Sequence, residues 1–341
     1  MSRHQSALVN VSQYVVARMA ASMMGVIDTR TVLRTAGDLA KVLHRLDKRH
    51  RKRAEMNIAS CFPDWDQSRI EEVAEESMRF LFQLAVEILQ APRFINIHTW
   101  QDRIRFVGVQ PALQRIVERK PLILLTGHCG NWEIWGWVLS TLGVQLHALA
   151  RPLDNPLIWR WFAGIRQKQG LRLVTKWGAT DEMVRIIDSG GIIGVIADQN
   201  AGDQGLFVPF FNRLASSYKS IALLALKYDV PVACGHAVRI GDDLRYELRL
   251  DDYIQPVDWY EVEDPVFYIT ARYNKAMETM IRSEPGRYLW MHRRWKSRPR
   301  FERLNRGVPG SLKRKLASLP WMDEETLQRI IADSEKGFRE G

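Results

Sequence analysis

Two patterns of apolar and polar positions recur through the middle of the chain: short apolar runs typical of strands, and longer segments with the spacing of helices. Five short runs are almost continuously apolar, as in strands buried on both faces, and a sixth at 245–253 alternates, as in a more exposed antiparallel strand. The five runs are 121–126, 144–150, 171–176, 192–198 and 231–240. Segments with helical spacing of apolar residues predict helices near 132–142, 155–169, 180–189, 216–228 and 264–284.

This order of elements predicts the fold class. Near-continuous apolar strands that alternate with helices indicate an α/β fold, with a mostly parallel central sheet flanked by helices on both faces. One more run, at 287–292, has the composition of a strand. A long amphipathic helix precedes the sheet; Ser68 and Glu71 have the spacing of a capping box at its start, and we expect Pro92 to end it.

The N-terminal segment Ala7–Ile27 is apolar but interrupted. Polar residues, including Gln13 and Arg18, keep it below the about 18 to 20 apolar residues of a spanning helix, and it lacks the pattern of a signal peptide. It is either an interfacial membrane helix or a helix packed on the protein body. We expect an N-terminal membrane-associating helical segment with a basic segment (1–60), a central α/β domain (61–306) and a basic link with a short helix (307–341).

Positive charge is concentrated near the C-terminal end. The 341 residues carry a formal net charge of +10, and residues 286–315 hold eleven Lys or Arg against the single Glu302. A second basic run is Lys48–Arg53. Such patches attract nucleic acid, anionic lipid headgroups or acidic proteins. No recognised nucleic-acid-binding module accompanies Trp295 and its neighbouring arginines, so we expect no nucleic-acid partner.

The cysteines and histidines do not predict a metal site. Cys61, Cys129 and Cys234 lie far apart without metal-ligand spacing, which indicates a reducing compartment, and the eight histidines form no HExxH pattern. Cys129 follows His128 directly. It is either a nucleophile or a small side chain that fills a turn.

The stretch "TGHCGNWE", Thr126–Glu133, places chemistry at the end of a predicted strand. His128 follows the strand 121–126, and Glu133 lies in the first turn of the next helix. Reactive groups of open α/β sheets gather at the carboxyl ends of strands. A neutral histidine there can take the proton of an alcohol that attacks an ester or thioester, while a carboxylate holds the ring. Taken alone, the pair is also compatible with a structural histidine or a metal ligand.

Three further motifs follow this stretch along the chain, and one precedes it. They are "ARPLDNP" (150–156), "ADQNAGDQGLFVPFF" (197–211) and "WMHRRWKSRP" (290–299), with "KRAEMNIASCFPDW" (52–65) upstream. Together with "GHCGNWE" they resemble the lipid A biosynthesis acyltransferases within the lysophospholipid acyltransferase superfamily, over about residues 40–300. Asn212 stands where that pattern leads us to expect glycine.

The resemblance implies acyl transfer from a carrier thioester to a hydroxyl of a lipid A precursor or related glycolipid. His128 would be the general base of the HxxxxD/E motif, without a covalent acyl-enzyme. Its acidic partner would be either Glu133 or Asp198, and the sequence does not choose between them. No cofactor is implied beyond the thioester donor, which is an acyl carrier protein or coenzyme A; the basic segment favours the acidic carrier protein.

Substrate-binding residues follow from the same resemblance. Arg151 matches the position expected to hold a phosphate or headgroup, and a guanidinium suits that task. Arg166 and Lys176 are weaker candidates for the same anion, with surface charge as the alternative. Asn131 either shapes the turn or donates to the oxyanion. The resemblance implies the cytoplasmic face of the inner membrane, with the protein either peripheral or anchored by its N-terminus.

Two other function classes remain open. The chain could bind glycolipids or an acyl carrier protein without catalysis, in which case loss of the His128 ring would leave binding intact. It could also hydrolyse a thioester or phosphoester, with or without a metal. Trp159 and Trp161 flank an arginine on one predicted helix, which suits a membrane interface as well as a buried core.

Overall fold

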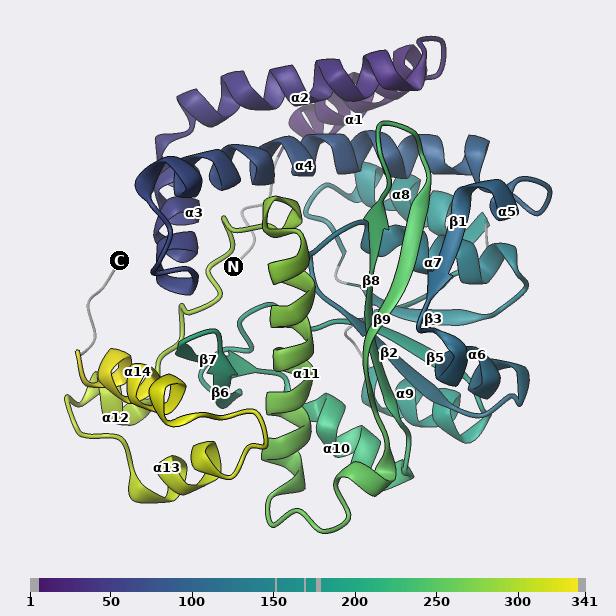
Figure 1. Cartoon of the computed structure of the whole chain (residues 1–341). Coiled ribbons are helices and arrows are strands. Elements are labelled where there is room, and N and C mark those ends of the chain that lie inside the picture. The colour runs from purple at the N-terminus through teal and green to yellow at the C-terminus, as the bar shows by residue number, and fades with distance from the viewer. Residues whose placement is uncertain (1–5, 151, 169, 176–178, 337–341) are drawn as a thin grey trace.

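The computed structural model describes residues 6–150, 152–168, 170–175 and 179–336. Its centre is a seven-stranded sheet in the order β1-β9-β8-β2-β5-β3-β4 (Figure 1). Neighbouring strands of this sheet are parallel, except that β8 and β9 are antiparallel. The strands are β1 (Ile104–Val107), β2 (Leu122–Thr126), β3 (Leu146–Ala150), β4 (Arg172–Thr175), β5 (Ile192–Ile196), β8 (Val232–Arg239) and β9 (Tyr246–Ile254).

Helices cover both faces of the sheet, as the apolar strands require. In β2, Ile123 and Leu125 belong to a core cluster shared with α9, α10 and α11, whereas Leu122 belongs to a cluster on the other face, shared with α7. This alternation follows the two-residue period of a strand. The helices are α6 (Gln110–Val117), α7 (Trp132–Thr141), α8 (Pro156–Lys168), α9 (Ala179–Asp188), α10 (Lys219–Tyr228) and α11 (Pro265–Ser283). The predicted fold class is confirmed.

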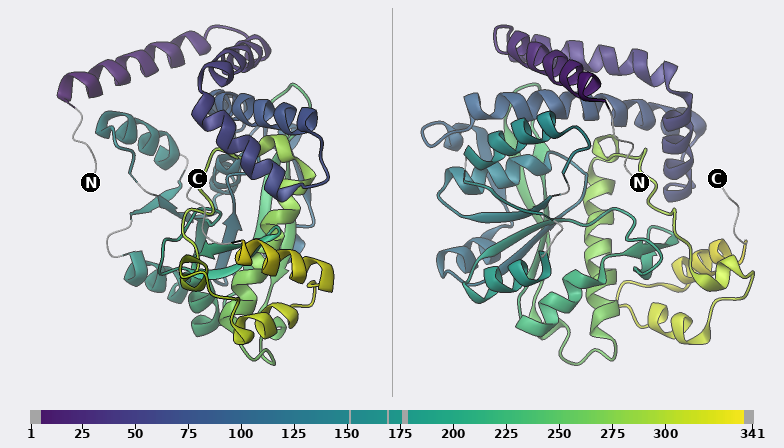
Figure 2. Two further views of the ribbon diagram at one scale, coloured as in Figure 1. Left: turned by 90° about the vertical axis from the view of Figure 1, so that its left-hand side faces the viewer. Right: turned by 180° about the vertical axis from the view of Figure 1, so that it is seen from behind.

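The N-terminal helices form a layer at one end of the sheet. The long α4 (Gln67–Phe94) crosses this end and α2 (Thr29–Leu46) lies along it, while α1 (Ala7–Met24) lies outside (Figures 1 and 2). α3 (Lys48–Cys61) connects α2 to α4. No residue of α1 is buried. Among the described residues, no helix is both long enough and apolar enough to cross a membrane.

Two predicted details of the long helix are wrong. Its N-cap is Asp66, whose carboxylate accepts a hydrogen bond from the backbone N–H of Arg69 at 2.8 Å, so Ser68 lies inside the first turn instead of capping it. Pro92 lies within the last turn, and the helix continues to Phe94. A proline there lacks the N–H for one hydrogen bond of the last turn, but the two residues after it keep helical backbone.

The region after Ile196 also differs from the prediction. The run 287–292 is not a strand: a 3₁₀ turn (Pro285–Arg287) leads into an irregular segment, in which an isolated β-bridge joins Tyr288 to Cys129. The predicted helix 216–228 begins only at Lys219, because β7 (Arg213–Ser217) pairs with β6 (Leu206–Phe210) in a hairpin that the pattern did not predict. Strand β1 was not predicted either. Asn212 lies in the turn between β6 and β7.

The C-terminal helices pack on this hairpin. α12 (Arg300–Arg303), α13 (Gly310–Ala317) and α14 (Glu324–Glu335) share an apolar cluster with β6, β7 and α11 (Figure 1). Inside the basic segment, Arg298 is buried and donates two hydrogen bonds to Glu302, at 2.7 and 2.9 Å. Part of the predicted surface charge is therefore internal.

Candidate active site

The register of two parallel strands brings His128 next to Asp198. Thr126, the last residue of β2, pairs with Ile196, the last residue of β5, and the backbone N–H of Ala197 donates to the Thr126 carbonyl at 2.9 Å. The chain therefore leaves both strands at the same edge of the sheet. His128 and Asp198 each follow two residues after their strand, and their side chains meet there.

His128 and Asp198 are joined by two hydrogen bonds. The imidazole Nδ1 lies 2.7 Å from one carboxylate oxygen of Asp198, and the backbone N–H of His128 donates to the other at 3.0 Å. The Asp198 side chain is 0% exposed, whereas the His128 side chain keeps 16% of its surface exposed. Because an ionised carboxylate only accepts hydrogen bonds, Nδ1 carries the proton and Nε2 is left as a base.

Burial and charge oppose each other in this pair. Burial disfavours the charged ring, but the charge of Asp198 and its hydrogen bond outweigh burial and raise the pKa of His128 above its ordinary value. Burial would likewise raise the pKa of Asp198, but the charge of His128 and its hydrogen bonds lower it well below the usual range. Asp198 is therefore ionised at neutral pH and stabilises an imidazolium on His128.

Glu133 makes a different interaction. Its carboxylate forms an ion pair with Arg166 of α8, in which the guanidinium Nε lies 2.9 Å from one oxygen and a second guanidinium nitrogen bonds the other. The indole N–H of Trp132 donates to the same carboxylate at 3.2 Å. Glu133 thus does not hydrogen-bond His128, although its charge contributes to the raised pKa of that ring. Arg166 is engaged by Glu133.

Asn131 is part of the framework of the turn. It caps α7, since its side-chain oxygen accepts a hydrogen bond from the backbone N–H of Glu133 at 3.2 Å. Its amide nitrogen donates to the buried Glu87 at 2.8 Å. Glu87 also accepts from the Tyr246 hydroxyl and from Arg239, both at 2.9 Å. This geometry fits the turn-shaping role of Asn131. Arg151 and Lys176 lie outside the described residues.

A glycine is required between His128 and Asn131. Gly130 has a φ of +58°, and a Cβ there would overlap the carbonyl group of Ala237. Only glycine combines this left-handed backbone with so close an approach to a neighbouring strand. The turn is therefore held against β8.

His292 is a site residue that the sequence analysis did not single out. Its ring stacks on His128 with 4.9 Å between centroids and 29° between planes, and Trp132 meets His128 edge-on with 4.7 Å between centroids. The available signal was the motif "WMHRRWKSRP", in which the arginines and Trp295 drew attention instead.

The side chain of Trp161, which the sequence left open between a membrane interface and a buried core, contacts α1: its ring centroid lies 6.3 Å from that of Tyr14 and 5.2 Å from the Arg18 guanidinium.

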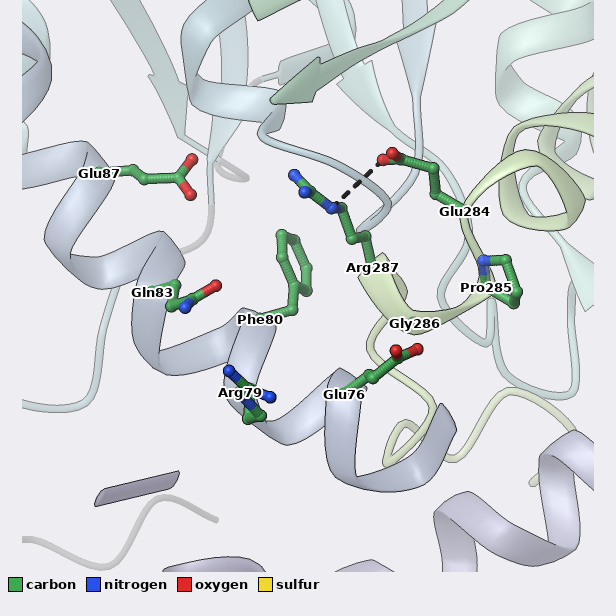
Figure 3. Close-up of a pocket in the computed structure, with 9 residues that line it drawn as sticks. All are labelled: Glu76, Arg79, Phe80, Gln83, Glu87, Glu284, Pro285, Gly286 and Arg287. Atoms are coloured by element: carbon green, nitrogen blue, oxygen red, sulfur yellow. Dashed lines mark ion pairs between the residues drawn. The ribbon is translucent and has the colours of Figure 1, made fainter. Parts of the chain in front are cut away.

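A cavity of about 310 Å³ lies beside the turn, between α4 and the segment 284–287 (Figure 3). Its lining is mostly charged and includes Glu76, Arg79 and Glu284, the last within 3.4 Å of Arg287. Phe80 also lines it and separates it from Trp132, whose ring lies 6.4 Å away. The cavity adjoins the His128 turn, because two of its lining residues, Glu87 and Arg287, accept hydrogen bonds from Asn131 and Gly130. Within the described ranges, no three His, Cys, Asp or Glu side chains are grouped as metal ligands.

The chain was compared with known proteins. The family model "Bacterial lipid A biosynthesis acyltransferase" matches residues 3–297. A lipid A biosynthesis acyltransferase of Haemophilus influenzae is 24% identical over 249 residues, which are 72% of this chain and 75% of the relative. In Escherichia coli K12, the lipid A biosynthesis palmitoleoyltransferase is 25% identical (74% and 80% covered) and the myristoyltransferase 22% identical (76% and 79%). The chain is thus an acyltransferase that belongs to the bacterial lipid A biosynthesis acyltransferase family.

Proposed function

We propose that this protein transfers a fatty acyl chain from a thioester donor to a hydroxyl of a lipid A precursor or related glycolipid, with His128 as the general base. The observation that carries the proposal is the hydrogen bond between His128 Nδ1 and the buried Asp198 at 2.7 Å. It leaves Nε2 of a partly exposed ring as the proton acceptor. The printed names of the relatives, a palmitoleoyltransferase and a myristoyltransferase of lipid A biosynthesis, support the acceptor class.

The acyl chain passes directly from the donor to the acceptor, without a covalent acyl-enzyme. The acceptor oxygen attacks the thioester carbonyl carbon while its proton passes to Nε2 of His128, and Asp198 stabilises the resulting imidazolium. The tetrahedral intermediate then breaks its C–S bond. The departing sulfur takes the proton back from His128, so that an ester and a free thiol leave and the imidazole is restored.

Cys129 does not suit the role of a nucleophile. Its side chain is 2% exposed, and its Sγ lies 3.8 Å from the sulfur of Met280 in the core. Burial, followed by the nearby carboxylates, raises the pKa of its thiol far above the ordinary value. A thiolate, which is the reactive form, is therefore strongly disfavoured. This supports direct transfer, and it favours the space-filling role of Cys129.

A basic cluster beside the site supports an anionic donor. α3 presents Arg49, Arg53 and Asn57 at four-residue intervals, and so on one face of the helix. The Asn57 side chain donates to the carbonyl oxygens of Trp290, at 2.7 Å, and His292, at 3.1 Å. The same face of α3 therefore borders the segment whose ring stacks on His128.

Arg293 joins Arg49 and Arg53 in this cluster. Arg53 donates to the carbonyl of Met291 at 3.3 Å, and burial, together with the charges of Arg293 and Arg49, lowers its pKa. In the part of the chain that the structure describes, none of the three arginines has a carboxylate partner. The charge of Asp47 offsets part of theirs, but three cations that repel one another still favour an anionic ligand. The donor would be an acidic acyl carrier protein or coenzyme A.

The donor can be tested by charge removal. Changing Arg49, Arg53 and Arg293 together to Gln should raise the KM for the acyl donor roughly tenfold and leave the KM for the glycolipid unchanged. Arg51→Gln is the matched control, since Arg51 pairs with Glu55 at 3.6 Å on the same helix. An acyl carrier protein donor and an acyl coenzyme A donor would be compared side by side. An unchanged KM for both would remove this cluster from the proposal.

The N-terminal helix α1 would bind the cytoplasmic face of the inner membrane. α1 exposes large apolar side chains along its length: Leu8, Val16, Met19 and Met23 are each more than 60% exposed. It is held by Asn155, the residue before α8, whose amide donates to the Asn10 carbonyl at 3.0 Å. A helix that exposes this much apolar surface suits the boundary between lipid headgroups and acyl chains. Changing Val16 and Met19 to Glu should abolish sedimentation with anionic vesicles; retained sedimentation would contradict the assignment.

The function is tested most broadly by lipid mass spectrometry. Lipids from cells with and without the gene would be compared, and the gene would be restored as wild type or as His128→Ala. We expect the deletion to remove one acyl chain from a glycolipid, the wild-type gene to restore it and the variant to fail. The mass lost would identify the acceptor and the chain length together. Unchanged glycolipids in the deletion, or full restoration by the variant, would reject the proposal.

A further inference from the structure

The segment that carries His292 is fixed to the His128 turn. The backbone N–H of Gly130 donates to the Arg287 carbonyl at 2.9 Å, and that of Leu289 donates to the His128 carbonyl at 3.2 Å. Trp290 is fully buried, and its indole N–H donates to the Pro285 carbonyl at 2.8 Å. The half-buried ring of His292 therefore stands on a rigid support, stacked on the proposed base.

The neighbours of His292 favour its neutral form with the proton on Nε2. The side-chain nitrogen of Gln199 lies 3.5 Å from Nδ1 of His292. An amide nitrogen donates, so Nδ1 accepts and Nε2 carries the ring proton. Burial and the neighbouring His128 lower the pKa of His292 below its ordinary value. When His128 becomes an imidazolium during the reaction, the second ring stays neutral and remains a donor.

The turn itself has few donors left for an oxyanion. The backbone N–H groups of His128, Gly130 and Asn131 already donate to Asp198, to Arg287 and to Ala237. The side-chain amide of Asn131 donates to Glu87, and the Asn131 residue is 2% exposed. The fourth residue of the turn, Cys129, is also 2% exposed. These groups serve the fold and offer little to the negative charge that develops on a thioester oxygen, so a donor from another segment would stabilise it.

We propose that His292 is that donor: its Nε2–H binds the thioester carbonyl oxygen and stabilises the oxyanion formed when the acceptor attacks. This inference rests on the proposed function. As the acceptor oxygen bonds to the carbonyl carbon, its proton moves to His128 and the carbonyl electron pair moves onto the oxygen held by His292. When the C–S bond breaks, the oxyanion reverts to a carbonyl and the thiol leaves with the proton from His128. His292 itself exchanges no proton.

Two variants separate hydrogen-bond donation from stacking. His292→Phe keeps a flat ring against His128 but removes the donor, and His292→Gln keeps an N–H donor without the ring. With a myristoyl-acyl carrier protein donor and a purified lipid A precursor, we expect the Phe variant to lose about 10²- to 10³-fold in kcat, as for loss of an oxyanion donor, with KM for both substrates and Tm nearly unchanged. The Gln variant should recover at least tenfold of this loss.

The outcomes keep this inference distinct from the proposed function. If the wild type transfers acyl chains, His128→Ala does not, and His292→Phe matches the wild type, the role of His292 is wrong while the base assignment stands. Equal losses in the Phe and Gln variants would show that an N–H donor at this position does not restore activity, and would also overturn the inference. If the wild type transfers no acyl chain to any tested glycolipid, the proposed function fails and takes this inference with it.

Discussion

Replacing Asp198 by Asn tests the electrostatic part of the site. The substitution keeps the size and shape of a side chain that is 0% exposed and removes its negative charge. Two hydrogen bonds change, because the carboxylate accepts from both the ring and the backbone N–H of His128. An Asn amide can offer its N–H to Nδ1 and so favour the tautomer in which Nε2 carries the proton. In that tautomer His128 is no longer a base.

The size of the expected loss in kcat follows from the distance between the His128 ring and the Asp198 carboxylate. Opposite unit charges 2.7 Å apart interact by about 6 kcal/mol at an effective dielectric constant of about 20. In the resting enzyme the ring is neutral and gains little of this energy, whereas in the transition state it is becoming an imidazolium and gains most of it. Since about 1.4 kcal/mol corresponds to tenfold in rate, the upper limit is about 10⁴-fold. Partial exposure of the ring to water weakens the interaction between the two charges, and we expect kcat to fall about 10³- to 10⁴-fold.

The protein contains a matched control. His236 and Asp251 form a second pair of the same type, with 2.7 Å between Nδ1 and the carboxylate and a histidine side chain that is 1% exposed. Asp251→Asn should destabilise the protein to a similar degree without a comparable loss of kcat. Acyl transfer would be followed with purified variants, alongside thermal unfolding. A kcat for Asp198→Asn within tenfold of the wild type, or an equal loss in Asp251→Asn, would refute this reasoning.

Three further predictions concern charge and stability. The raised pKa of His128 places the acid limb of kcat/KM above pH 6.5, because the base is lost as pH falls through that pKa; a pH–rate profile with an acid limb below 6 would contradict this. Glu133→Gln should shift the acid limb to lower pH, since the charge of Glu133 helps to raise the pKa, and should lower kcat less than loss of the Asp198 carboxylate; a larger loss would make Glu133 the primary partner. Glu87→Ala should cost about 3 to 5 kcal/mol of unfolding free energy in urea titrations, because it leaves the buried Arg239 guanidinium without its carboxylate; a loss below 1 kcal/mol would be inconsistent.

Six of the seven strands of the sheet, and the helices α7 to α11, could be predicted from the sequence because short apolar runs alternate with segments of helical spacing; β1 could not. The ends of β2 and β5 were predicted to within a few residues, and so were the carboxyl-end positions of His128 and Asp198. Their contact could not be predicted in the same way. It depends on β5 lying next to β2 in the sheet, and strand order is a property of tertiary packing that no local pattern contains.

The wrong predictions have a common physical origin. The run 287–292 is apolar because Tyr288 and Trp290 are buried between α4, α11 and the His128 turn, not because it pairs in a sheet. Apolar composition reports burial, and burial does not require a strand. The hairpin of β6 and β7 was missed for the opposite reason: its strands contain Pro209 and two serines, which local propensity places in loops.

Charge in the C-terminal segment was misjudged for a related reason. Arg294 is 1% exposed and donates to the Ser217 hydroxyl and the Asn274 side chain, at 2.7 and 2.8 Å. Its guanidinium joins the hairpin to α11 inside the protein. A buried arginine and a solvated one are identical in a sequence, so a count of basic residues overstates the surface available to an acidic partner.

The most direct test of the central claim is the rate of acyl transfer by purified His128→Ala. A radiolabelled thioester of acyl carrier protein and a purified lipid A precursor would be mixed with excess enzyme, and acylated glycolipid would be quantified over a single turnover. The account predicts that the variant folds, binds both substrates and forms product at least about 10²-fold more slowly than the wild type, as expected for removal of a general base. Product formation at the wild-type rate would show that the imidazole does not take the proton, and would contradict the mechanism.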